Sequence, residues 1–164
     1  MLKKLLFACA VLGLVAGCKG KPKATESNLS AQGGDAVDST PMSFDPQGSD
    51  SGRISGLNTI RFGYDQSTLS AEAKTTLKGN AEWLKARPGV RMQIEGHCDS
   101  RGTIEYNVSL GERRANTVKS YMVSLGISAD RLSTISYGEE KPVAMGDSEA
   151  DMAKNRRANF VPVQ

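Results

Sequence analysis

Strand-like and helix-like segments alternate through residues 53–164, and this alternation restricts the fold more than any other feature. Segments in which apolar and polar residues alternate predict half-buried strands, because successive side chains of a strand point to opposite faces. Segments with apolar residues three or four positions apart predict helices that bury one side. We expect strands at 58–62, 90–95, 132–137 and 158–163, and helices at 71–87, 109–125 and 149–155. The order βαβαβαβ predicts an α+β domain whose helices pack on a four-stranded mixed sheet, on one face or on both.

Local signals mark the ends of the expected elements. Ser70 is a good N-cap for the first helix, and the Pro-Gly pair at 88–89 closes it. Ser109 and Glu112 have the spacing of a capping box, which predicts that the second helix begins at Ser109. Pro162 has no N–H to donate to a sheet, so it predicts that the last strand is an edge strand or frays.

The N-terminal residues have the form of an export signal. Lys3 and Lys4 precede a short apolar run that ends in Val-Ala-Gly-Cys at 15–18. The run is shorter than the roughly 20 apolar residues that span a bilayer, and it fits the apolar region of a secretory signal. Its end resembles the lipobox of bacterial lipoproteins, which implies cleavage before Cys18 and acylation of that residue. By the same resemblance, Lys19 in place of Asp implies the outer membrane. The alternative is an ordinary signal peptide with a chance cysteine.

Residues 19–52 have the composition of a flexible tether. They are rich in Gly, Ser, Pro, Asp and Lys, and their few apolar residues follow neither a strand period nor a helix period. Such a segment cannot bury enough apolar surface to offset the entropy that it would lose on ordering. The predicted organisation is a signal peptide at 1–17, lipidated Cys18 with the tether at 18–52, and a folded domain at 53–164.

Cleavage would also change the charge and the cysteine count. The full chain has a formal net charge of +3, and loss of Lys3 and Lys4 brings it closer to neutral. Since the chain has neither a basic run nor a ladder of aromatic residues, we expect no nucleic-acid partner. Cys9 would leave with the signal and Cys18 would carry lipid. Cys98 would then be the single thiol, and no intrachain disulfide is expected.

A dense polar cluster lies between residues 95 and 116. His97 and Cys98 are metal-ligand types, and Asp99 or Glu105 could complete a set. However, neighbours at the end of a strand point to opposite sides, so we expect no metal site. The same geometry disfavours a nucleophile pair of Cys98 and His97, which needs a base within hydrogen-bond reach of the thiol. We interpret Cys98 as a small, partly buried apolar residue and His97 as a donor that caps the loop. The prediction is a protein with no catalytic residues and no cofactor.

The cluster is better suited to binding a small group that carries both charges. Asp99 lies in the loop after a strand, where side chains often bind ligands, and its carboxylate could hold an ammonium group. Arg113 and Arg114 follow in the helix, about 100° apart, so at most one of them would face the loop, where it could bind a carboxylate. The alternative is that Asp99 and Arg114 pair with each other and only fix the loop. The residues alone leave both interpretations open.

The stretch GHCDSRGTIEYNVSLGERRA at 96–115 resembles the signature of OmpA-like peptidoglycan-binding domains, most closely the lipoproteins of the Tol–Pal system. The resemblance covers about residues 57–160 and implies an OmpA-like fold. It further implies an outer-membrane lipoprotein whose domain faces the periplasm and binds the diaminopimelate of peptidoglycan stem peptides without covalent chemistry. Such a protein would tether the outer membrane to the cell wall and support envelope integrity and constriction at cell division. A TolB-like periplasmic protein is the implied partner.

The same resemblance assigns roles to individual residues. Asp99 would accept the ammonium of the ligand, and Arg114 would bind its carboxylate. Arg113 is assigned to the surface or to an internal pair, and residues 155–157 to structure or to a partner surface. The other residues implied at the binding site are Phe62, Gly63, Cys98, Arg101, Thr103, Asn107 and Leu110.

Two positions depart from the pattern of the family. Gly63 stands where the family has an acidic residue after Phe62, while Asp65 lies two residues on and thus on the same side of an extended chain. Cys98 stands where the family has Ala or Thr. An alternative function is therefore the same fold used as a partner-binding or surface module, with weakened or lost peptidoglycan binding.

Overall fold

The structure is a computed structural model that describes residues 48–163. The predicted signal peptide, Cys18 and the tether up to residue 47 lie outside this range. Of the helices between residues 48 and 163, none has the length and apolar character that a bilayer span requires.

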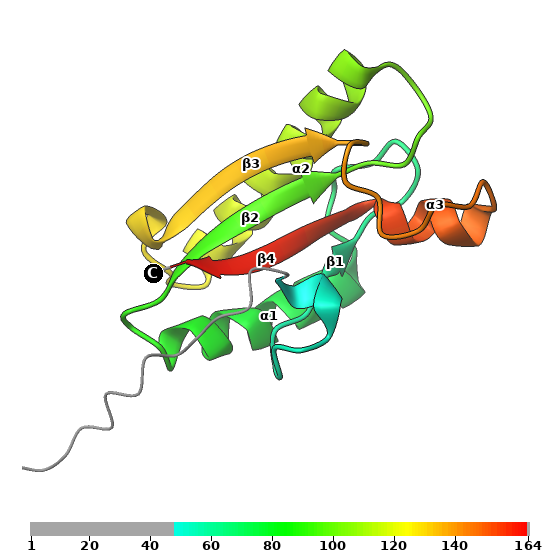
Figure 1. Cartoon of the computed structure of the whole chain (residues 1–164). Helices are drawn as coiled ribbons and strands as arrows, with labels where there is room; N and C mark the ends of the chain where they lie inside the picture. The colour runs from blue at the N-terminus through cyan, green and yellow to red at the C-terminus, as the bar shows by residue number, and fades with distance from the viewer. Residues whose placement is uncertain (1–47, 164) are drawn as a thin grey trace, which may run out of the picture. The chain divides into compact units, whose positions relative to one another are not determined.

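Four strands form one mixed sheet (Figure 1). They are β1 (Ile60–Arg61), β2 (Arg91–His97), β3 (Leu132–Gly138) and β4 (Arg157–Val163), in the order β1-β4-β2-β3. β2 runs parallel to β3, whereas β4 runs antiparallel to both β1 and β2. The last strand of the sequence thus inserts between the first and the second, and the predicted four-stranded mixed sheet is confirmed.

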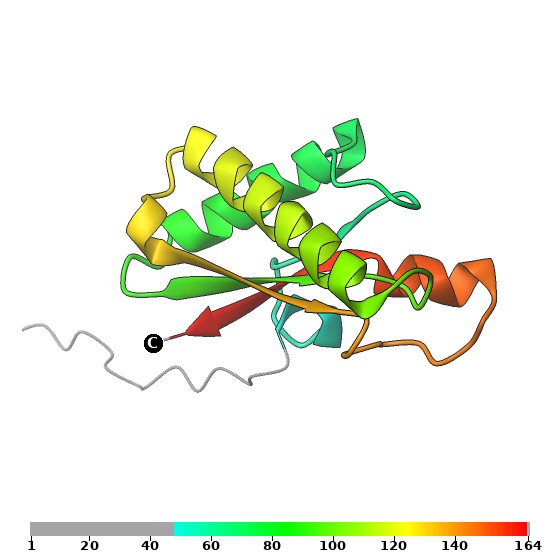
Figure 2. The same ribbon diagram turned by 90° about the horizontal axis from the view of Figure 1, so that it is seen from above.

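The two long helices cover a single face of the sheet. They are α1 (Ala71–Lys85) and α2 (Ile104–Ser124), while the short α3 (Glu149–Asn155) lies beyond the ends of the strands (Figure 2). The opposite face, which we call the open face, carries the 3-10 turn η1 (Ser49–Ser51). A second 3-10 turn, η2 (Ala129–Arg131), leads into β3. The sequence analysis left open whether the helices pack on one face of the sheet or on both. In the structure, α1 and α2 pack on the same face.

The core lies between α1, α2 and the sheet, where the predicted periodicities place apolar side chains. In β2 the alternation buries Met92 and Ile94, and Ile94 lies opposite Phe160 of β4. On the helices the buried residues recur at helical spacing, as in Leu77 and Leu84 of α1. These side chains are close to fully buried, and burial of a side chain of this size contributes about 1.5–3 kcal/mol.

The start of α2 differs from the prediction. The helix begins at Ile104, and Thr103 is its N-cap, whose hydroxyl accepts a hydrogen bond from the Tyr106 amide at 3.3 Å. Ser109 lies inside the helix and is exposed, so its apparent capping box with Glu112 caps nothing. The first turn was hidden because it faces the polar cluster: only Asn107 is buried among residues 104–109, and no apolar stripe marks it.

A backbone contact between two glycines fixes α2 on β2. A Cβ atom on Gly96 would lie 1.9 Å from the carbonyl oxygen of Gly111, and one on Gly111 would lie 2.3 Å from the Ser136 hydroxyl. Only hydrogen fits at both positions, so the helix and the strand approach each other directly. Arg114 follows Gly111 by about one turn, and the contact therefore brings its side chain to the end of β2.

Residues 48–52 belong to the folded part, although their composition places them in the predicted tether. Ser49 is buried and donates to the Asn159 side chain at 2.9 Å. Asp50 forms an ion pair with Arg157 at 3.0 Å. These contacts are polar and join η1 to β4 on the open face, which is why a search for apolar periodicity does not detect them.

β4 is bordered by β1 along only part of its length. β1 pairs with Arg157 and Ala158, while β2 pairs with β4 from Ala158 to Val163. The Phe160 amide donates instead to the Ser49 hydroxyl at 3.1 Å, on the side away from β2. Pro162 lies beyond the reach of β1, so the expectation of an edge strand fits only this second half of β4.

Candidate functional site

A cavity of about 200 Å³ lies where the loop after β2 meets the N-terminal half of α2. The loop after β1 and the residue before β4 complete its wall. Six of the nine predicted site residues line it, and they are joined by five others. The lining residues are Tyr64, Asp65, Cys98, Asp99, Arg101, Gly102, Tyr106, Asn107, Leu110, Arg114 and Arg156.

The other three predicted residues do not line the cavity, but each contacts a residue that does. The Phe62 ring packs against the guanidinium of Arg114, whose Cζ is 5.2 Å from the ring centre. The Gly63 carbonyl accepts a hydrogen bond from Arg114 at 3.2 Å. Thr103 caps α2. Phe62 and Gly63 therefore position Arg114, and Thr103 positions the helix that carries it.

Arg114 is fully buried and is held by backbone carbonyls. Its Nε donates to Gln66 at 2.8 Å, and Nη1 donates to His97 at 2.7 Å. Nη1 also contacts the Cys98 sulfur at 3.3 Å. Burial lowers the pKa of Arg114, although a guanidinium keeps its charge at neutral pH. No carboxylate of residues 48–163 forms an ion pair with it, so the cavity holds a buried positive charge that an anionic group could neutralise.

Asp99 is also buried, but its partners are neither solvent nor Arg114. Its Oδ2 forms ion pairs with Arg101 at 2.5 Å and with Arg156 at 3.0 Å. Burial alone would raise the pKa of Asp99, but hydrogen bonds from these two arginines outweigh it and hold the pKa below its ordinary value. The alternative in which Asp99 and Arg114 pair with each other is therefore wrong, and their charges remain separate within one cavity.

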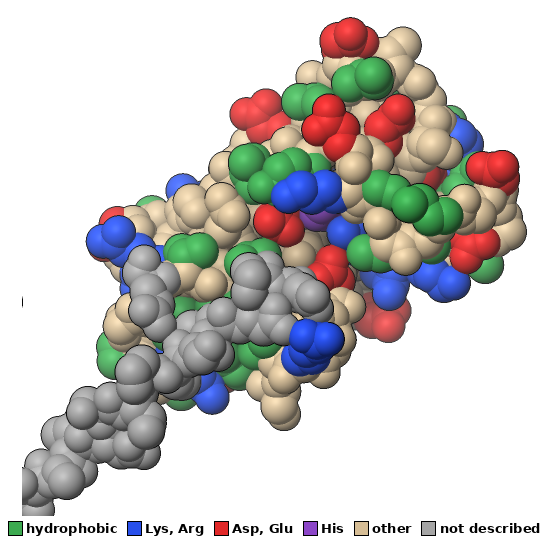
Figure 3. All heavy atoms as spheres, in the orientation of Figure 1, with side chains coloured by type: hydrophobic (Ala, Val, Ile, Leu, Met, Phe, Trp, Pro, Cys, Tyr) green, Lys and Arg blue, Asp and Glu red, His purple; other side chains and the backbone are tan. Residues whose placement is uncertain are grey.

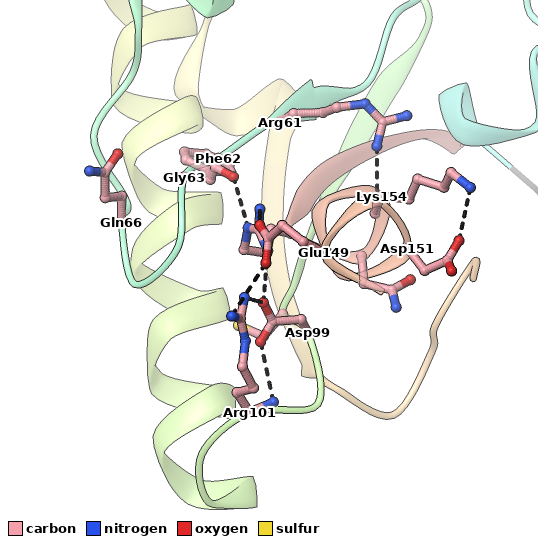
Figure 4. Close-up of polar contacts among 12 residues, drawn as sticks. Arg61, Phe62, Gly63, Gln66, Asp99, Arg101, Glu149, Asp151 and Lys154 are labelled. Atoms are coloured by element: carbon pink, nitrogen blue, oxygen red, sulfur yellow. Dashed lines mark hydrogen bonds and ion pairs between the residues drawn. The ribbon is translucent and has the colours of Figure 1, made fainter. Parts of the chain in front are cut away.

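Arg156 links the cavity to α3. It donates to the Phe62 carbonyl at 3.2 Å and to Glu149 at 2.7 Å, in addition to its contact with Asp99. Figure 4 shows Asp99, Arg101 and Glu149 joined in one network of polar contacts. The sequence assigned Arg156 to structure or to a partner surface. It reaches Asp99 across 57 residues of chain, through the pairing of β4 with β2, and no local pattern signals that contact.

Tyr64 and Tyr106 form an exposed rim, with Asp65 between them. The hydroxyl of Tyr106 is hydrogen-bonded to Asp65, and the guanidinium of Arg101 lies 4.0 Å from the centre of the Tyr64 ring. Asp65 has a φ of 53°, a turn conformation that Asp tolerates better than most residues. The chain is therefore not extended here, but Asp65 still reaches the cavity, to which Gly63 contributes no carboxylate of its own. The sequence analysis did not assign either tyrosine to the site, although both lie within the region that resembles the family.

Cys98 lies in the cavity wall as a buried thiol. Its sulfur donates to the Asn107 carbonyl at 3.3 Å, and burial raises its pKa above the ordinary value despite the opposing effect of Arg114. A thiol with a raised pKa is a poor nucleophile at neutral pH, because the thiolate is the reactive form.

His97 does not cap a loop, contrary to the prediction. It is the last residue of β2, which continues beyond Glu95 because a bulge lets His97 pair with Gly138 of β3. Its ring is buried, stacks 5.7 Å from Tyr137 and has Nε2 3.6 Å from the Glu95 carboxylate, too far for a hydrogen bond. Among the described residues, neither ring nitrogen has a hydrogen-bond partner. Residues 48–163 also contain no group of three or more His, Cys, Asp or Glu side chains placed to hold a metal ion.

Comparisons with known proteins identify relatives of the chain. Residues 61–156 match the OmpA family. A peptidoglycan-associated lipoprotein of Pasteurella multocida is 38% identical over 157 residues, which cover 96% of this chain and 95% of that protein. One from Legionella pneumophila is 38% identical over 163 residues and covers 96% of this chain and 92% of that protein.

Solved structures share the fold. The crystal structure of the peptidoglycan-associated lipoprotein from Burkholderia pseudomallei has a TM-score of 0.62 and 37% identity, and it covers 64% of this chain and 89% of that one. The C-terminal domain of Helicobacter pylori MotB has a TM-score of 0.63 but 22% identity, so it supports the fold alone. The chain therefore belongs to the OmpA family and, within it, to the peptidoglycan-associated lipoproteins.

Proposed function

We propose that the chain is an outer-membrane lipoprotein that binds diaminopimelate in peptidoglycan stem peptides without forming a covalent bond. The observation that carries the proposal is the unneutralised charge of Arg114 in the same cavity as the Asp99 carboxylate. A diaminopimelate residue presents an ammonium and a carboxylate on one carbon. A cavity with a fixed cation and a fixed anion on separate walls matches that pair of charges.

Each end of the ligand would have its own partner. Three of the five N–H groups of Arg114 go to the carbonyls of Gln66, His97 and Gly63, and a fourth faces the Cys98 sulfur. One Nη2 hydrogen remains for a ligand carboxylate, so the expected contact is a single charged hydrogen bond rather than a two-point one. The ammonium would lie against Asp99, with Asp65 as a second carboxylate on the rim.

We assign the protein a binding role rather than a catalytic one. Its relatives are named peptidoglycan-associated lipoproteins, a name that refers to no enzymatic activity. Cys98, the nucleophile that an enzyme would use, has a raised pKa and donates to a backbone carbonyl rather than to a base.

The proposed arrangement in the envelope follows from the whole chain. Acyl chains on Cys18 would hold one end in the outer membrane, the tether would cross part of the periplasm, and the domain would grip the wall. Many anchored copies that face one polymeric wall tolerate a modest affinity at each site. We further propose a TolB-like periplasmic partner and a role in the Tol–Pal system, with support for envelope integrity and division.

A titration of the soluble chain that starts at Lys19 with a diaminopimelate-containing muropeptide tests this function. Asp99→Ala and Arg114→Ala should each lose about 2–5 kcal/mol of binding free energy. The first variant leaves the ammonium of the bound ligand without its partner, and the second leaves the carboxylate without its partner. Arg113→Ala is the matched control, since Arg113 is the exposed neighbour of Arg114 and should leave the affinity within about twofold.

Arg114→Lys and Asp99→Asn accompany these variants in case the alanine variants unfold, and a thermal melt establishes the fold of each. If the unchanged chain fails to bind the muropeptide, the diaminopimelate assignment is wrong. The alternative role as a partner-binding module, for which Gly63 is the support, would then be favoured.

A further inference from the structure

We propose that Arg101 occupies the ammonium position of the cavity in the unliganded protein and must leave Asp99 before a ligand binds. Arg101 would then be an internal competitor that sets both the affinity and the selectivity of the site. This inference rests on the proposed function, since it concerns the same cavity and the same ligand class.

Two arginines share one oxygen of Asp99, but they are attached differently. The Arg156 side chain is 7% exposed, and its other nitrogens donate to the Phe62 carbonyl and to Glu149. The Arg101 side chain is 34% exposed, and its second ionic contact, to Glu149, is longer, at 3.4 Å. Arg156 is therefore a fixed part of the wall, whereas Arg101 can leave toward solvent.

Arg101 is also incompletely satisfied where it lies. Its Nε is buried and has no acceptor among the described residues. A buried donor without a partner is unfavourable, and this penalty disappears when the side chain moves into water. The exposed Tyr64 ring, 4.0 Å from the guanidinium, offers a surface along which the side chain can remain after it leaves Asp99.

The charges that line the cavity favour binding in which the ligand replaces the Arg101 guanidinium, rather than binding beside it. Arg101, Arg114 and Arg156 line it together with Asp65 and Asp99, so the wall carries one excess positive charge. When the Arg101 guanidinium withdraws, the remaining charges of the wall balance, and a neutral zwitterion enters without disturbing that balance. A simple amine would have to displace Arg101 with no gain at Arg114, whereas a simple carboxylate would leave Arg101 in place. The site should thus select groups that carry both charges.

The affinity of Arg101 variants for a diaminopimelate-containing muropeptide tests the proposal. If the closed form predominates by about ten to one, its removal by Arg101→Ala should tighten the apparent dissociation constant about tenfold. Arg101→Lys keeps the charge but loses the planar set of guanidinium N–H donors. Its apparent dissociation constant should lie between those of Arg101→Ala and the unchanged chain. Arg156→Gln is the contrasting variant and should weaken binding, because Arg156 is a fixed part of the wall.

The outcomes separate this proposal from the function on which it rests. Tighter binding by Arg101→Ala supports competition. Equal or weaker binding overturns it, and weaker binding identifies Arg101 as a direct ligand contact instead. If neither the unchanged chain nor Arg101→Ala binds the muropeptide, the proposed function itself fails.

NMR signals of the Arg101 Nε–H group give a second readout. They should shift toward those of a solvated guanidinium when the muropeptide is added, and unchanged signals in the bound state would overturn the proposal.

Discussion

Arg114 donates from Nη1 to the backbone carbonyl of His97 at 2.7 Å, while the imidazole of His97 lies on the open face of the sheet. One residue therefore holds the arginine of the cavity with its backbone, while its buried ring lies on the other side of the sheet. Figure 3 shows that face, with part of the single histidine of the chain visible between acidic and basic side chains.

The buried imidazole of His97 should make the domain less stable in mild acid. Burial lowers the pKa of His97 below its ordinary value of 6.5, and the carboxylate of Glu95 opposes this only in part. Since the unfolded chain binds the proton more readily, the stabilisation is complete above about pH 6.5 and is lost as the pH falls below it. Thermal melts from about pH 7.5 to about pH 5 should fall less steeply for His97→Gln than for the unchanged chain. Parallel curves would contradict the prediction.

The contact between Gly96 and Gly111 should tolerate no side chain. Gly111→Ala would press a methyl group against Ser136 and the backbone of β2, and we expect a loss of about 1–3 kcal/mol in the free energy of unfolding. Gly79→Ala in α1 is the control, because that position is exposed with no atom within 4 Å, and it should gain about 1 kcal/mol. Urea denaturation measures both, and a neutral Gly111→Ala would show that α2 can move away from the sheet.

The folded domain should need residues 48–52. A chain that starts at residue 53 lacks Asp50 and leaves the buried Arg157 without its carboxylate, so it should be less stable by about 3–5 kcal/mol than a chain that starts at residue 48. Asp50→Asn in the longer chain should reproduce part of that loss. Equal urea midpoints for the two lengths would place the boundary where the composition suggests it.

The thiol of Cys98 should be dispensable. In a chain that starts at Lys19 it is the single cysteine, and its raised pKa predicts slow alkylation at neutral pH until the protein unfolds. Cys98→Ala should bind the muropeptide within about threefold of the unchanged chain, because it removes one weak contact to Arg114 and no charge. Rapid labelling of the native protein, or lost binding by the variant, would require a direct role for the sulfur.

The sequence predicts well those helices and strands that are specified by local patterns, such as an N-cap residue or the alternation of apolar and polar side chains. Ser70 does cap α1, and Met92 and Ile94 of β2 face the core as their alternation predicts. The start of α2 was misplaced because the pattern Ser109 to Glu112 imitates a cap within a helix, while Thr103 carries the true one. Capping patterns are short, so chance matches inside a helix are common.

Only those residues of the site that lie within one sequence motif could be predicted. Asp99, Arg101 and Arg114 lie within a single stretch of sequence and do reach one cavity. The pairing of Asp99 with Arg156 depends on how β4 inserts between β1 and β2, a long-range event that local patterns do not encode. For the same reason, the sequence analysis predicted that the Asp99 carboxylate is free to bind a ligand cation. In the folded protein it is already paired with Arg101 and Arg156.

The proline near the end of β4 has a consequence for self-association. Since the Phe160 amide points away from β2, the amide of the residue two positions on would point the same way, and that residue is Pro162. Since the Phe160 amide is already bonded to Ser49, neither residue 160 nor residue 162 offers a free donor where β1 no longer borders the strand. A second copy of the chain that tried to extend the sheet along this margin would find the ladder of hydrogen bonds broken, which disfavours edge-to-edge aggregation.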